Sequence, residues 1–133
     1  MKKGRNVLLV ATLLFLTSCA SITKFPVSST LPAAEITAKT KQDKNKNYSI
    51  VITAKYLASP DRLNPPKNNY NVWIVTEENG TKNLGMLTNK NAKKAVLKTK
   101  TPFKVIEIFI TAEDQGNLSY PNGIEISRTN IKR

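Results

Sequence analysis

The stretch YNVWIVTEENGTKNLGMLT, residues 70–88, decides the fold class of this chain. Its apolar run VWIV indicates a strand with both faces covered. Asn79-Gly80 follows, and this dipeptide is the strongest short signal for a β-hairpin. We therefore predict a strand over residues 70–77 that turns at this dipeptide and pairs with a second strand over residues 81–88.

The flanking sequence contains further segments in which apolar and polar residues alternate, separated by turn residues. Seven short strands in about 100 residues predict an all-β fold, an immunoglobulin-like antiparallel β-sandwich of about seven strands. One segment, NAKKAVLKTK at residues 91–100, could instead form an amphipathic helical turn, although Pro102 argues against its extension. The other predicted strands cover residues 34–39, 48–57, 92–99, 103–112 and 124–128.

Period-two alternation also predicts which side chains face the core. One face of the strand at residues 48–57 carries Ile50, Ile52 and Ala54, flanked by Tyr48 and Tyr56. The strand at 103–112 is predicted to turn three isoleucines inward, and the aromatic residues are interpreted as core rather than as a ligand cage. These residues are Ile106, Ile108, Ile110, Tyr48, Tyr56, Tyr70 and Trp73.

The start of the chain resembles the signal peptide of a bacterial lipoprotein. MKKGR carries three positive charges, and VLLVATLLFL (residues 7–16) is shorter than the roughly 20 residues of a membrane-spanning helix. LTSC, residues 16–19, resembles the lipobox, in which an apolar residue and two small residues precede a cysteine. The resemblance implies cleavage after residue 18 and lipidation of Cys19. A signal-anchor helix or an ordinary secretory signal is the alternative.

Cleavage would divide the chain into three parts: the signal peptide at residues 1–18, a lipidated cysteine with a flexible tether at 19–32, and the sandwich domain at 33–133. The tether is predicted because ASITKFPVSSTLP is rich in Ser, Thr and Pro and has no sustained period. Removal of Lys2, Lys3 and Arg5 leaves 18 basic and nine acidic residues, a net charge of +9. Ala20 replaces the Asp typical of inner-membrane retention, which favours an outer-membrane lipoprotein facing the periplasm.

Two segments resemble a known family. YNVWIVTEENGTKNLGMLT, followed by IEIFITAEDQGNLSYPNG, is similar to the extracytoplasmic C-terminal domain of anti-sigma-K-type factors. The resemblance covers about residues 45–128 and implies a β-sandwich outside the cytoplasmic membrane. The chain has neither the sigma-binding segment nor the membrane-spanning helix of that family, so anti-sigma activity is not implied.

The residue inventory argues against catalysis. The chain has no histidine, and lipidation would consume its single cysteine, so carboxylates and hydroxyls are the remaining candidates. Glu77-Glu78 falls in a hairpin, and Glu113-Asp114 opens a loop that lacks the residue order of a known calcium site. We interpret both pairs as solvated turns, and we predict no catalytic residue, no metal and no cofactor.

Lysines are the most informative polar feature. In an immunoglobulin-like order, the tether would enter at the end with the loops of residues 58–69 and 113–123. Basic residues would then gather at the other end, away from the anchor, where they could bind an acidic envelope partner such as peptidoglycan or a protein. The alternative is that lysines merely cover solvent-facing surface and edge strands. The residues are Lys39, Lys41, Lys44, Lys46, Lys98, Lys100, Lys104, Lys132 and Arg133.

These features predict a lipid-anchored, non-catalytic binding module of the bacterial cell envelope. Nucleic acid is not an expected partner, because an exported protein rarely meets it. The alternative function is a structural accessory subunit of an envelope assembly. A large exposed apolar patch would favour that alternative, whereas an open polar surface would favour the binding module.

Overall fold

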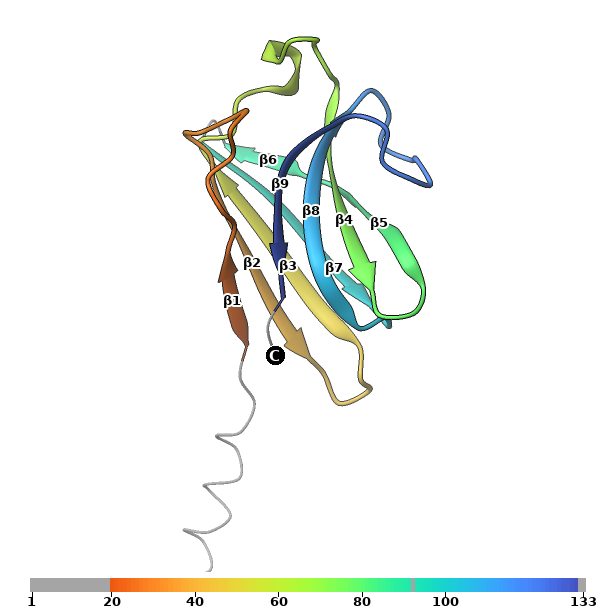
Figure 1. Ribbon diagram of the computed structural model, residues 1–133. Helices are drawn as coiled ribbons and strands as arrows, with labels where there is room; N and C mark the ends of the chain where they lie inside the picture. The colour runs from red at the N-terminus through yellow and green to blue at the C-terminus, as the bar shows by residue number, and fades with distance from the viewer. Residues whose placement is uncertain (1–19, 92, 132–133) are drawn as a thin grey trace, which may run out of the picture.

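Antiparallel strands make up most of the described chain. The computed structural model describes residues 20–91 and 93–131 (Figure 1). A short 3-10 turn, η2 (Pro60–Arg62), lies in the loop between β3 and β4. The strands are β1 (Ser21–Lys24), β2 (Glu35–Gln42), β3 (Tyr48–Lys55), β4 (Asn69–Thr76), β5 (Gly80–Met86), β6 (Thr88–Asn91), β7 (Lys94–Thr101), β8 (Val105–Glu113) and β9 (Ile124–Asn130).

The strands form two sheets that pack face to face. One has the order β1-β2-β3-β7-β6 and the other has the order β5-β4-β8-β9. The chain crosses between the sheets after β3, after β5 and after β7, which is the pattern of an immunoglobulin-like sandwich with extra edge strands. The predicted all-β sandwich is therefore confirmed.

Seven of the described strands match the predicted ones, and β1 and β6 were missed. Each missed strand has only four residues, SITK and TNKN, which is too short for a clear alternation. The helical alternative for residues 91–100 is wrong, because Lys94–Thr101 is a strand. Its inward residues Ala95 and Leu97 lie opposite Ala54 and Ile52 of β3, so pairing with β3 determines the conformation of this segment.

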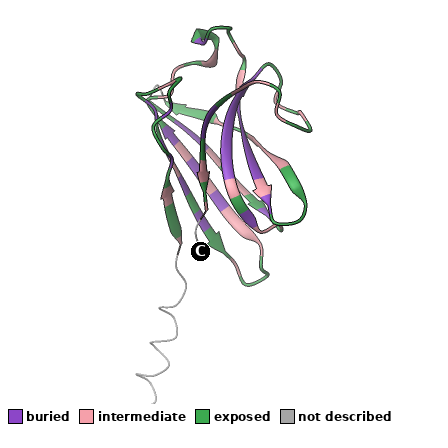
Figure 2. Cartoon of the chain, viewed as in Figure 1, coloured by how far each residue is buried: buried purple, intermediate pink, exposed green. Residues whose placement is uncertain are grey.

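The main core lies between the sheets, where the buried faces of the strands meet (Figure 2). Ile50, Ile52 and Ala54 of β3 are fully buried there, as predicted. Trp73 is also fully buried, but it lies on the other face of β4 and is not part of this cluster. Tyr56 is the exception, because it follows the last residue of β3, has a positive φ and is 52% exposed. Tyr48 is half-buried at the other end of that strand.

A register shift changes the predicted face of β8. Ile108 and Ile110 are fully buried, but Ile106 is 37% exposed and Val105 is buried in its place. The pairing of β4 with β8 is irregular between Val75 and Thr76, so Ile106 is an extra residue. A β-bulge of this kind turns the following side chains to the opposite face, which strict alternation could not anticipate.

The predicted flexible tether is wrong for its described part, residues 20–32. Ser21–Lys24 is strand β1, paired with β2, and Phe25 is 5% exposed within the core. The Ser127 hydroxyl of β9 donates a hydrogen bond to the Pro26 carbonyl at 3.0 Å. The folded unit therefore begins with β1 rather than at residue 33, because Phe25 and the β1 backbone supply contacts that composition did not reveal.

The predicted point of entry is also wrong. In β1 the chain runs antiparallel to β2, with Ser21 opposite Thr40 and Lys24 opposite Thr37. The described chain therefore begins beside the β2–β3 hairpin, at the end opposite the β3–β4 and β8–β9 loops (Figure 1). An extra strand at the edge of the sheet reverses the direction of the N-terminal segment.

Candidate functional site

The sheet pairings bring four of the predicted lysines together on the outer surface of the five-stranded sheet. Lys41 and Lys100 lie on either side of Ser49 in one row, and Lys39 and Lys98 flank Val51 in the next. Neighbouring strands are about 4.8 Å apart. The lysines thus form a compact cluster although two come from β2 and two from β7.

The β2–β3 hairpin extends this cluster beyond the end of the sheet. Lys44 and Lys46 are exposed in the hairpin, and Lys46 has a φ of 66°. Asp43 accepts hydrogen bonds at 2.9 Å from the amides of Asn45 and Asn47, which fixes the turn. We name the surface formed by Lys39, Lys41, Lys44, Lys46, Lys98 and Lys100 the basic face.

The basic face keeps a strong positive charge. Within its two rows and the hairpin, as far as the structure describes them, the acidic residue is Asp43, whose carboxylate is 3.8 Å from the Lys100 ammonium. Lys104 lies on the β7–β8 turn at the same end, but it forms an ion pair with Glu77 at 3.0 Å and belongs to the side of the other sheet. Lys132 and Arg133 lie outside the described residues.

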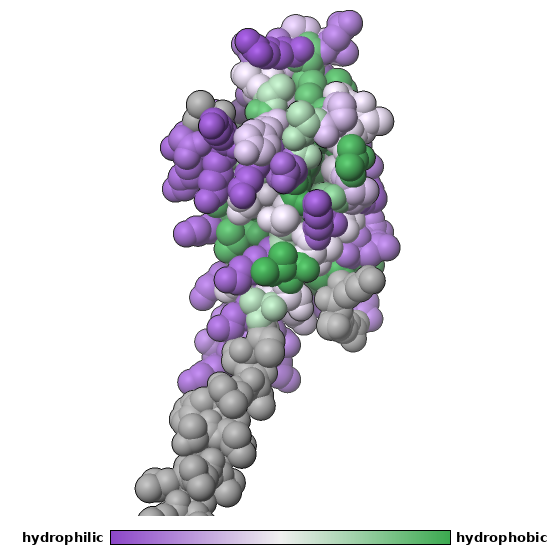
Figure 3. Space-filling model, turned by 90° about the vertical axis from the view of Figure 1, so that its left-hand side faces the viewer, coloured by the Kyte–Doolittle hydropathy of each residue, from purple (hydrophilic) through white to green (hydrophobic). Residues whose placement is uncertain are grey.

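An exposed apolar residue, which no sequence pattern indicated, accompanies these lysines. Ile22 of β1 is 72% exposed and lies opposite Lys39, in the row that continues to Val51 and Lys98. Figure 3 views the edge of the molecule that carries β1, where small apolar areas are surrounded by hydrophilic side chains. The basic face thus combines cations with an apolar residue at its border.

The basic face and the start of the described chain lie at the same end of the sandwich. Ser21 is opposite Thr40, next to Lys41, and Cys19 is two residues before Ser21. Cys19 itself lies outside the described residues. The expectation that the lysines point away from the anchor position is wrong, because β1 turns the N-terminal segment back towards the hairpin.

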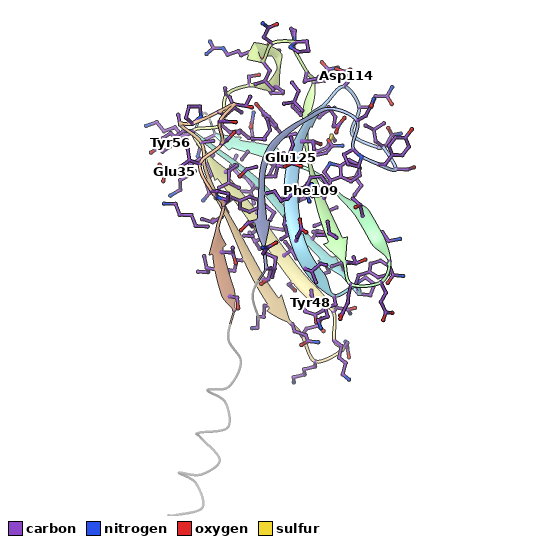
Figure 4. The ribbon with its side chains drawn as sticks, viewed as in Figure 1. Glu35, Tyr48, Tyr56, Phe109, Asp114 and Glu125 are labelled. Atoms are coloured by element: carbon purple, nitrogen blue, oxygen red, sulfur yellow. The ribbon has the colours of Figure 1, made fainter. Side chains whose placement is uncertain are left out.

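A cleft of about 380 Å³ lies at the opposite end of the molecule. It is bounded by the end of β3, the β3–β4 loop, the β5–β6 crossover and the beginning of β7. Figure 4 shows the separation of the two ends, because it labels Tyr48 near the β2–β3 hairpin and Tyr56 at the far end of the same strand. The eight residues of β3 span about 26 Å between these ends.

The cleft lining can form hydrogen bonds but carries little ionisable chemistry. Asn69, Asn89 and Thr88 contribute neutral polar groups, Leu57 and Leu87 contribute apolar surface, and no carboxylate lies among the lining residues. Lys94 adds one cation to the lining, so the mixture is suited to binding a polar molecule that is neutral or carries a negative group.

Tyr70 also lines the cleft and is held in its neutral form. Its hydroxyl donates a hydrogen bond to the Ala58 carbonyl at 2.7 Å. Burial, and secondarily the negative charge of Asp61, raises the pKa of Tyr70 to about 12. The phenol is therefore protonated at neutral pH, and it donates its proton in a hydrogen bond to the Ala58 carbonyl of the β3–β4 loop.

A buried polar chain supports the β8–β9 loop on the outer surface of the other sheet. The Trp73 indole Nε1 donates to Thr111 Oγ1 at 2.8 Å, and that hydroxyl donates to Glu113 Oε2 at 2.6 Å. The same carboxylate oxygen accepts a hydrogen bond from the Asn122 amide at 3.1 Å. The interpretation of Glu113-Asp114 as a solvated turn is thus correct for the exposed Asp114 but wrong for Glu113, which is 1% exposed within β8.

An aromatic layer continues this arrangement along the sheet. Trp73 stacks on Phe109 with ring centroids 6.2 Å apart, and the Arg128 guanidinium lies 4.0 Å above the Phe109 ring. Hydrogen bonds to Glu125 and, more weakly, to Glu107 raise the pKa of Arg128 above its ordinary value. The β8–β9 loop and an ion-pair network of Arg128 with Glu107 and Glu125 therefore cover this part of the outer surface of the sheet.

Comparisons with protein-family models, curated proteins and solved structures gave no match to this chain. The resemblances to lipoprotein signal peptides and to the anti-sigma-K-type domain therefore stay predictions. Among the described residues, no helix has the length and apolar character required to cross a membrane. The same residues contain no group of three or more Asp, Glu, His or Cys side chains arranged to hold a metal ion.

Proposed function

We propose that this protein is a lipid-anchored, non-catalytic binding module of the bacterial cell envelope. The anchor would be Cys19, and the sandwich would lie on the periplasmic side, at the outer membrane. The charged start of the chain, the short apolar segment and LTSC support export and lipidation. A protein held by two or more acyl chains remains stably on its membrane.

The observation that carries this proposal is the pairing of Ser21 with Thr40, only two residues after Cys19. A lipid on Cys19 would hold the end with the β2–β3 hairpin at the membrane surface. The opposite end, with the cleft and its neutral hydrogen-bonding groups, would then face the periplasm. This arrangement supports a module that offers its loop end to an envelope ligand.

The distribution of exposed apolar residues favours the binding module over a structural accessory subunit. The large exposed apolar side chains of the described residues come from six separate segments of the chain rather than from one sheet face. A stable docking interface would need a contiguous apolar area of several hundred Å². These side chains are Ile22, Val27, Tyr56, Met86, Ile106 and Tyr120.

An acidic periplasmic partner for the lysines is the weaker candidate. It was expected on the premise that the lysines lie far from the anchor, and the β1–β2 pairing removes that premise. A pull-down on purified cell wall tests it: salt-sensitive retention of the intact protein would restore this candidate, because attraction between exposed charges is screened by salt.

Mass spectrometry of the mature protein tests the anchor. The full chain is expressed in a Gram-negative host, and the N-terminal peptide is expected to begin at Cys19 with a diacylglycerol on the sulfur. Cys19→Ala should abolish lipidation and release the protein from the membrane fraction. The double variant Cys19→Ala with Ser29→Cys keeps one thiol at an exposed position and should remain unlipidated. An unlipidated wild-type protein, or cleavage at another site, would contradict the proposal.

A further inference from the structure

We propose that the basic face binds anionic phospholipid headgroups of the same leaflet that holds the anchor. This inference rests on the proposed lipidation of Cys19. It adds a second membrane contact, made by the folded domain, whose effect is to orient the sandwich with its cleft away from the membrane. Three observations support this inference: the position of Ser21 beside Thr40, the charge of the basic face and the exposure of Ile22.

The position of Ser21, two residues after Cys19, limits how far the lysines can be from the membrane. Two residues span at most about 7 Å, whatever conformation they adopt. Ser21 is fixed opposite Thr40, so a lipid on Cys19 would bring Lys41 and the hairpin lysines Lys44 and Lys46 close to the headgroups. A lipid on Cys19 would therefore place the basic face next to the membrane surface.

The charge of this end is divided between its two sides. The basic face has six lysines against Asp43, whereas Glu77, Glu78 and Glu107 belong to the other sheet and the hairpin that joins β4 to β5. Glu107 is engaged by Arg128 at 2.7 Å. An anionic leaflet would therefore attract the side of the five-stranded sheet more strongly than the other side, where Lys104 and Arg128 already form ion pairs with Glu77 and Glu107. Lysines near such a surface each contribute roughly a fivefold gain in binding.

Ile22 fits the same surface. An isoleucine that is 72% exposed, in register with Lys39 and three residues from the lipidated position, would enter the boundary between headgroups and acyl chains. Segments that bind the membrane interface combine cations with apolar side chains in this way. The charged cluster and the apolar residue thus favour a lipid surface over an acidic protein or a soluble polyanion.

The experiment uses the lipidated full-length protein in vesicles and one introduced thiol. Because the acyl modification consumes the only cysteine, Lys44→Cys gives a unique site for a fluorophore. Tyr120→Cys, at a residue 71% exposed on the β8–β9 loop, is the matched site at the far end. Quenching by headgroup-labelled lipid is measured in phosphatidylcholine vesicles with and without phosphatidylglycerol.

We expect phosphatidylglycerol to increase quenching at position 44 and not at position 120, and about 1 M salt to remove the increase. In the labelled Lys44→Cys protein, the further substitutions Lys39→Gln, Lys41→Gln and Lys98→Gln together should reduce the ratio of docked to undocked protein about a hundredfold. The control variant Lys55→Gln, Lys90→Gln and Lys93→Gln alters three exposed lysines at the other end and should leave that ratio unchanged.

Several results would overturn the inference. They are equal quenching at position 44 in neutral and anionic vesicles, insensitivity to salt, or equal effects of the two triple variants. Mass spectrometry of the same preparations separates the two proposals. If the protein is lipidated but does not dock, the anchor stands and the basic face is not a membrane contact. If the protein is not lipidated, the proposed function itself fails.

Discussion

Ser21 lies opposite Thr40 in the antiparallel pairing of β1 with β2. This one relationship determines which end of the sandwich is closest to the proposed anchor and brings the basic face beside it. It also makes the N-terminal segment part of the folded domain, because β1 leads directly into the buried Phe25.

Phe25→Ala should destabilise the mature protein by about 3 kcal/mol or more, because it removes a buried aromatic side chain from the core. Val27→Ala, at a residue 76% exposed two positions later, should change stability by no more than about 0.5 kcal/mol. Urea unfolding gives both values. Equal and small effects would mean that the segment before β2 is a tether after all.

Ile22→Ser should leave the urea midpoint unchanged, since most of the Ile22 side chain is already in contact with solvent. It should nevertheless reduce docking of the lipidated protein on anionic vesicles, because a side chain that enters the interface is lost. Ile106→Ser, an exposed isoleucine on β8 of the other sheet, is the control. A similar loss of docking in both variants would argue against a specific role for Ile22.

Glu113→Gln should destabilise the protein by about 1–3 kcal/mol, because one buried carboxylate oxygen accepts hydrogen bonds from both Thr111 and Asn122. Hydrogen exchange should show faster opening of the β8–β9 loop. Asp114→Asn, which weakens an exposed ion pair with Lys67, should cost less than about 1 kcal/mol. If the two variants behave alike, the buried polar chain does not hold the loop.

Stability should fall as the pH rises above 10, and Tyr70→Phe should reduce this fall. The pKa of Tyr70 is raised from 10.0 to about 12 in the folded protein, chiefly by burial. The unfolded state therefore loses the phenol proton first, and folding stability is full below pH 10 and is lost as the pH rises towards 12. Unfolding midpoints of both proteins between pH 8 and about 12 provide the measurement. An unchanged pH dependence in Tyr70→Phe would show that another group causes the loss.

The fold class could be predicted because its signals are local. The apolar run before Asn79-Gly80, the hairpin turn and the alternation around Ile50 each depend on a few consecutive residues. The exceptions have physical causes. The bulge beside Val75 shifts Ile106 outward, and the four-residue strands β1 and β6 have too little sequence for a period to appear.

Local patterns were enough to predict the all-β sandwich, its seven main strands and a group of lysines that could act together. The position of those lysines relative to Ser21 depends instead on the pairing of β1 with β2, which no local pattern indicates. The burial of Glu113 also depends on tertiary contacts, because its carboxylate accepts hydrogen bonds from Thr111 and Asn122, which lie on the two sides of the β8–β9 loop. Pairing between distant segments depends on the whole packed core, and this is why the orientation of the lysine cluster could not be predicted from local sequence.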